Sequence, residues 1–106
     1  MYNTSGSNNT FVGTGATASA LTGSHNTTLG AYAGTALTGG ANNNTLLGYQ
    51  AGNSITSGAG NILIGYDVDA PTATTDSHLN IGNTIYGNLS TGNVGIGTAS
   101  PNNLSK

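Results

Sequence analysis

The sequence predicts an all-β chain with a repetitive β-solenoid or β-prism-like architecture. Three observations support this fold class. A short polar-to-aliphatic run that closes on a glycine recurs six times, side-chain character alternates within each run, and 18 of the 106 residues are glycine, which disfavours helix. Successive closing glycines are 17, 18, 17, 17 and 15 residues apart, a period typical of stacked repeats. These glycines are Gly13, Gly30, Gly48, Gly65, Gly82 and Gly97.

Each run is expected to form one short strand with two faces. The residues one and three positions before the closing glycine are aliphatic or carry a methyl group, so we expect them to be buried. The residue between them varies in character and is expected to face solvent or a second chain. The predicted buried residues are Val12, Leu29, Leu47, Ile64, Ile81 and Ile96, with Thr10, Thr27, Thr45, Ile62, Leu79 and Val94; the predicted outward residues are Phe11, Thr28, Leu46, Leu63, Asn80 and Gly95.

The rest of each early repeat carries weaker columns. Three residues after the glycine stands a small or β-branched residue: Ala16, Ala33, Ala51 or Val68. A second aliphatic column, expected in a second short strand before a Gly/Asn turn, holds Leu21, Leu37 and Ile55.

The pattern divides the chain into four parts. Residues 1–65 form a shaft of glycine-closed repeats with a period of 17–18 residues. Residues 66–76 contain a proline and three of the four charged residues, and are expected to form a loop that interrupts the stack. Residues 77–97 are expected to form a distinct, tighter β end segment, and residues 98–106 a tail.

Composition disfavours several functions. Only 4% of residues are charged and the net charge is −2, so nothing neutralises phosphates, and nucleic-acid or anionic-membrane binding is not expected. No apolar run is long enough for membrane insertion. A surface so poor in charge favours self-association, and a core of one or two aliphatic side chains per repeat is thin. We therefore expect a homotrimer in which three chains share a core, and end-to-end filament formation stays open.

Four segments, residues 43–52, 60–67, 79–87 and 92–101, resemble the repeats that precede the C-terminal chaperone domain in phage tail fibres and bacterial tail-fibre-domain proteins. The resemblance covers residues 8–101, and the ordered series ending in Gly-Ile-Gly-Thr-Ala-Ser-Pro is its most specific part. A secondary likeness is to the shorter head repeats of trimeric autotransporter adhesins. The resemblance implies an elongated, intertwined β-rich homotrimer in an extracellular or virion shaft. It leaves open whether the chain is a mature product, a fragment or a free-standing subunit.

Few residues are candidates for chemistry. Asp76 and His78, with Ser77 or Ser90, would make a triad on paper, but proximity in sequence does not define one, and turn residues are the preferred interpretation, as for His25. The carboxylates of Asp67, Asp69 and Asp76 could ligate Ca²⁺, and a metal shared across a three-fold axis stays open, but their spacing matches no EF-hand and a solvated loop is preferred. We assign no catalytic residue, metal site or cofactor.

Two further patterns have structural interpretations. Asn8, Asn26, Asn43 and Asn88 begin glycosylation triplets, which we interpret as turns leading into strands. Tyrosines that recur near the closing glycine favour packing between repeats or chains over sugar stacking. The five tyrosines are Tyr2, Tyr32, Tyr49, Tyr66 and Tyr86.

The preferred function is therefore non-enzymatic: a trimeric β-rich shaft segment of a phage-type tail fibre or extracellular filament. The alternative is a surface-binding module, a β-solenoid that binds glycan or ice, because Thr10, Thr27 and Thr45 share a column and a cell-surface glycan is a candidate partner. A spike-type hydrolase is disfavoured because the chain has no glutamate and no acid pair suited to glycoside hydrolysis.

Overall fold

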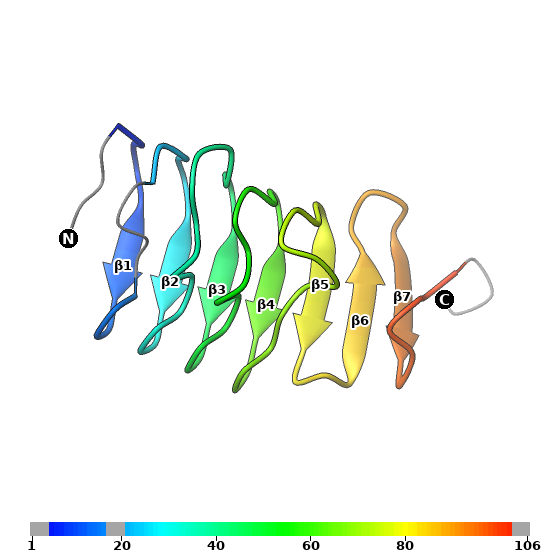
Figure 1. Cartoon of the computed structure of the whole chain (residues 1–106). Coiled ribbons are helices and arrows are strands. Elements are labelled where there is room, and N and C mark those ends of the chain that lie inside the picture. Colours follow the sequence, from blue (N-terminus) through cyan, green and yellow to red (C-terminus); the bar gives the residue numbers. More distant parts are fainter. Residues whose placement is uncertain (1–4, 17–20, 103–106) are drawn as a thin grey trace.

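Seven short strands form one sheet in chain order in the computed structural model, which describes residues 5–16 and 21–102 (Figure 1). Within these residues there is no helix. Tyr2 lies outside the described residues. The strands are β1 (Thr10–Val12), β2 (Thr27–Leu29), β3 (Thr45–Leu47), β4 (Ile62–Ile64), β5 (His78–Ile81), β6 (Ile85–Asn88) and β7 (Asn93–Ile96).

The first five strands are parallel, and between each strand and the next the chain makes one complete coil. Four coils stack into a β-solenoid, and the extents of the chain, with the strands that follow the coils included, are 43 × 22 × 19 Å. The strands β5, β6 and β7 then continue the sheet as an antiparallel meander. The all-β, solenoid prediction is confirmed, and a single chain closes each coil.

The corners of the coils are hydrogen-bonded along the axis as regularly as the strands. The N–H of Gln50 donates to the C=O of Ala31 at 2.9 Å, and the N–H of Asp67 donates to Tyr49 at 2.9 Å. Because loops as well as strands satisfy their backbone groups in the adjacent coil, the stack has an ordered ladder on every side.

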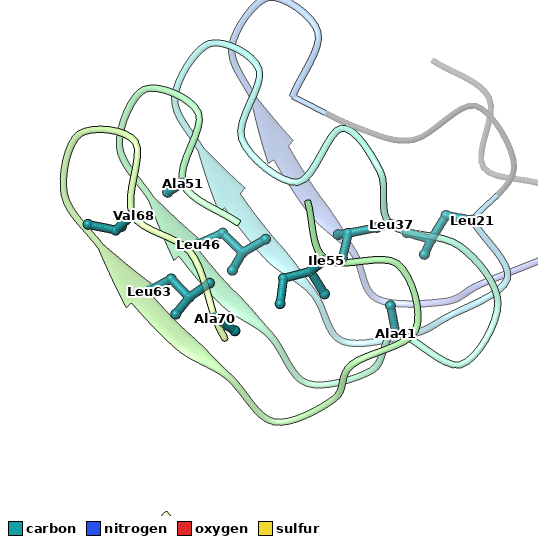
Figure 2. Close-up of a cluster of buried hydrophobic side chains, with 9 residues drawn as sticks. All are labelled: Leu21, Leu37, Ala41, Leu46, Ala51, Ile55, Leu63, Val68 and Ala70. Atoms are coloured by element: carbon teal, nitrogen blue, oxygen red, sulfur yellow. The ribbon is translucent and has the colours of Figure 1, made fainter. Parts of the chain in front are cut away.

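The core lies inside the coils and contradicts the predicted facing of the strands (Figure 2). Leu46 and Leu63, from the middle column, are fully buried, whereas Val12 and Leu29 are 53% and 47% exposed. A three-residue strand has one inward and two outward side chains, and the narrow interior has room for one per strand. The middle column is therefore inside and the two flanking columns are outside.

The second aliphatic column is buried, but it does not form the expected second strand. Leu21, Leu37 and Ile55 are all fully buried and face the strands across the interior. Leu37 and Ile55 lie in tight turns, in which their N–H groups donate three residues back, to Gly34 at 3.1 Å and Gly52 at 3.2 Å. A turn fits here because this side of the coil must bend sharply to return to the sheet.

The closing glycines are required by both conformation and space. Gly13, Gly30, Gly48 and Gly65 have φ between +131° and +141°, a region essentially restricted to glycine. A Cβ at Gly48 would also overlap the carbonyl group of Gly65 in the next coil. Adjacent coils thus approach at this corner more closely than any side chain allows.

Residues 66–76 contain no strand, but they complete the fourth coil. The C=O of Val68 accepts from Gly52 N–H at 2.8 Å, and the C=O of Ala73 accepts from Thr56 N–H at 2.8 Å. The side chains of Val68 and Ala70 are buried in the core. This segment therefore follows the path of the earlier coils despite its different composition.

Candidate functional site

The outer face of the sheet carries most of the exposed large aliphatic side chains of the described chain. We call it the outer face and define it by two columns of side chains that point away from the core. The register continues both columns through the antiparallel strands, because Ile81 pairs with Ile85, which pairs with Ile96, and directly opposite residues share a face. The aliphatic column is Val12, Leu29, Leu47, Ile64, Ile81, Ile85 and Ile96.

The second column of the outer face changes in character along the axis. It begins with three exposed threonines on β1 to β3 and is aliphatic on β4, β5 and β7, with a glycine on β6. Its members are Thr10, Thr27, Thr45, Ile62, Leu79, Gly87 and Val94. Neither column contains a charged residue, and Ile96 is 79% exposed at the C-terminal end. A contiguous apolar face of this kind indicates an interaction surface.

A ladder of buried asparagines runs along the axis where the chain enters the sheet. In Asn44, the side-chain Nδ2 donates to Asn26 Oδ1 at 3.0 Å and to the C=O of Gly58 at 2.9 Å, and Oδ1 accepts from the N–H of Asn61 at 2.9 Å. Asn9 and Asn26 repeat this arrangement. Each carboxamide thus hydrogen-bonds to an adjacent coil and also donates to a backbone carbonyl in the turn that leads to the next strand.

The ladder was missed by the sequence interpretation of these asparagines. Asn8 and Asn43, the first residues of two glycosylation triplets, do lie in turns, with φ of 58° at each. Asn26, however, is fully buried, and its side chain belongs to the ladder rather than to a surface turn. The recurrence of Asn directly before the strand was the available signal.

The last positions of the ladder differ from the others. His78 stands where an asparagine would continue it, and its N–H donates to Asn61 Oδ1 at 2.8 Å. Burial lowers the pKa of His78 below its ordinary value, and its ring lies 6.4 Å from that of Tyr86. On β7, the Oδ1 of Asn93 is buried and has no hydrogen-bond partner within the described residues.

Three tyrosines stack on one corner of successive coils. The ring of Tyr49 lies edge-on to Tyr32 at 6.1 Å and parallel to Tyr66 at 5.5 Å. Packing between repeats, predicted from their recurrence, is confirmed for these three. Tyr66 ends the stack and is 75% exposed.

Two of the aspartates considered for catalysis or metal binding accept hydrogen bonds from the backbone of the preceding coil, and Ser90 and His25 contact asparagine side chains. Asp76 accepts from the N–H of Ala59 at 2.7 Å, and Asp69 accepts from the N–H of Ser54 at 3.1 Å. Ser90 Oγ donates to Asn88 at 2.6 Å, and the exposed His25 ring lies 3.2 Å from the Asn8 amide. Among the described residues, no hydrogen bond joins Asp76 to His78, and no group of three His, Cys, Asp or Glu side chains lies close enough together to hold a metal ion.

The described part of the chain has no pocket, and none of it forms a helix that is both long and apolar enough to cross a membrane. Comparisons with protein-family models, with curated proteins and with solved structures found no match to this chain. The fold and the outer face therefore define a β-solenoid rod with one uncharged, partly exposed face.

Proposed function

We propose that the chain is a structural fibre protein, a trimeric β-rich shaft segment of a phage-type tail fibre or extracellular filament. The observation that carries the proposal is the aliphatic column of the outer face, which runs over all seven strands. The location we propose, extracellular or on a virion, follows from this role and from the resemblance of the repeats to tail-fibre shafts.

The proposed trimer places three outer faces toward a common axis. Each solenoid already contains its own core, which favours three closed rods side by side over chains that share each coil. Fully burying an aliphatic side chain contributes about 1.5–3 kcal/mol, so seven partly exposed ones contribute on the order of 5–10 kcal/mol per chain. This is comparable to the cost of association, about 4–15 kcal/mol, and the second column adds to it.

The proposed role is mechanical. Hydrogen bonds along the axis join every coil to the next, and bundling three rods would cover the outer face from water and from proteases. No cofactor or enzymatic step is part of the proposal.

The test is the native mass of the purified chain and of two lysine variants, measured by light scattering. Leu47→Lys places a charge in the middle of the outer face, and Thr74→Lys places the same charge on an exposed residue outside it. We expect the mass of a trimer, or a multiple of that mass, for the unaltered chain and for Thr74→Lys, and loss of this three-fold unit in Leu47→Lys. A monomer in all three at high concentration would rule out the trimer.

A second candidate function is supported by the threonine half of the outer face. Thr10, Thr27 and Thr45 are exposed and lie side by side in register on three successive strands, a geometry suited to an extended repetitive ligand such as ice or a glycan. Thermal hysteresis or a glycan-array signal that is lost in Thr27→Tyr would support this function. Silence in both assays would exclude it.

A further inference from the structure

We propose that the solenoid grows end to end, with the free edge of β7 pairing in parallel with the free edge of β1 of a second copy. This interaction uses the sheet edges rather than the outer face, so it does not depend on the trimer. The occupant of the β7 edge is thus another copy of this chain, added by translation along the axis.

Strand direction permits this pairing. β6 is antiparallel to β5, and β7 is antiparallel to β6, so β7 runs in the same direction as β1 to β5. Residues 93–97 also repeat the motif of residues 9–13, an asparagine, two outward residues flanking one inward residue, and a closing glycine. The meander therefore restores at the C-terminal end the kind of strand with which the solenoid begins.

The free backbone N–H and C=O groups on the edge of β7 lie in the positions that match those on the edge of β1. Gly97 N–H donates to Thr84 at 2.7 Å, and in an antiparallel ladder hydrogen-bonded pairs alternate, so Val94 and Ile96 direct their N–H and C=O groups away from β6. At the other end, Thr10 N–H donates to Asn26 at 2.9 Å, which leaves the N–H and C=O of Phe11 directed away from β2. This is the arrangement that joins consecutive coils within the chain.

The side chains fit the same register. Placing Val94 beside Thr10 and Ile96 beside Val12 continues both columns of the outer face and sets Gly95 beside Phe11. The Phe11 ring, only partly buried in the free chain, would then meet the Thr98 methyl group and the Pro101 ring, which lie over Gly95. Neither edge strand carries a charged residue, so no repulsion opposes the contact.

The unpaired Oδ1 of Asn93 is the observation that selects this register. In the ladder, Asn26, Asn44 and Asn61 each donate a backbone N–H to the Oδ1 of the preceding asparagine, at 2.8, 3.1 and 2.9 Å. Asn9 begins the ladder in the described chain, and its N–H occupies the donating position. In the proposed junction, the atoms that cover Asn93 Oδ1 in the free chain give way to Asn9 of the added copy, whose N–H donates to this acceptor.

The register can be tested by cross-linking, because the chain has no cysteine of its own. The Thr10→Cys and Val94→Cys variants are mixed and exposed to a mild oxidant, so that the product is a dimer of the two variants. Their Cα atoms would be about 4.8 Å apart, within disulfide range. The control mixture, Thr10→Cys with Ile96→Cys, would place them about 8 Å apart, too far to bridge.

We expect several-fold more dimer from the in-register mixture than from the control, and the same preference when both partners carry Leu47→Lys. Equal yields from the two mixtures, or loss of the preference with Leu47→Lys, would overturn the proposal, since contacts through the outer face would then explain the cross-links. Because Leu47→Lys is designed to abolish the trimer, failure of the trimer and failure of the end junction give different results.

Two substitutions test the hydrogen bonds of the junction without cysteines. Val94→Pro removes an N–H that is directed away from β6 and has no hydrogen-bond partner among the described residues, and Asn93→Ala removes the unpaired acceptor. Each should lower the end-to-end association constant about tenfold in sedimentation velocity, whereas Val94→Thr should leave it unchanged. Asn93→Ala should not lower the urea midpoint of the monomer. Unchanged association in both Val94→Pro and Asn93→Ala would refute the junction.

Discussion

Replacing Asn44 by alanine should remove a large fraction of the stability of the chain. The substitution deprives the N–H of Asn61 and the C=O of Gly58 of their carboxamide partners, both at 2.9 Å, in a position closed to water. An unsatisfied buried polar group costs about 1–3 kcal/mol, so the two together predict a loss of about 2–6 kcal/mol. Domains of this size are stable by only about 5–15 kcal/mol.

The assay is urea unfolding followed by far-ultraviolet circular dichroism. With a slope of about 1–3 kcal/mol per molar urea, the midpoint should fall by about 2 M. The matched control is Asn53→Ala, which makes the same chemical change outside the ladder and should cost less than about 0.5 kcal/mol. Measurements at two protein concentrations separate the contribution of association. Equal midpoints for the two variants would refute the structural importance of the ladder.

Three further perturbations have expected outcomes. Gly48→Ala meets both a φ of +131° and the carbonyl of the next coil, so thermal unfolding should show a loss of more than about 3 kcal/mol, against about 1 kcal/mol for Gly82→Ala, where φ is +59° and the space is open. Comparable losses would contradict the steric argument. Burial lowers the pKa of His78 in the folded chain, so as the pH drops the unfolded chain takes up a proton on this residue at a higher pH than the folded chain does. Stability should therefore fall as the pH drops below 6.5. Chemical unfolding should show that the free energy of unfolding decreases from pH 7 to pH 5. This pH dependence should disappear in His78→Asn and persist in His25→Asn. If it persists in His78→Asn, another group causes it. Tyr49→Ala removes the central ring of the stack and should cost about 1–3 kcal/mol in urea unfolding, and a change below about 0.5 kcal/mol would show that the stack is incidental.

The fold class could be predicted from sequence because every coil needs the same residue types at the same positions. The closing glycine recurs since a side chain there, as at Gly48, would overlap the next coil. The stacking of Tyr49 between its neighbours could be predicted for the same reason, because a residue that recurs once per coil meets its own equivalents.

The inside and outside of the strands could not be assigned from alternation alone. Alternation shows that Leu46 points away from Thr45 and Leu47, but both sets are apolar enough to be buried. The narrow interior of the coil decides which side chains point inward, because residues such as Leu37 fill it from the opposite side and leave room for one side chain per strand. The width of the interior is set by the path of the whole coil and cannot be deduced from the sequence of the strand alone.

The asparagine ladder could not be predicted because its partners are backbone groups. The carbonyl of Gly58 and the N–H of Asn61 have no sequence signature, so a buried Asn44 and a surface turn asparagine look alike. The unpaired oxygen of Asn93 is a property of its position beside β6, and only the folded sheet reveals it.

The column of closing glycines has a consequence for how the length of this rod can change. A deletion or insertion of a whole coil would bring each glycine, asparagine and outward residue back beside its equivalent, as residues 26–43 show in following residues 9–25. A change of a few residues would place a side chain where only a glycine fits and would leave an asparagine opposite the wrong corner. The length of the rod is therefore quantised, in steps of about 4.8 Å, and it can vary by recombination between coils more readily than by small insertions.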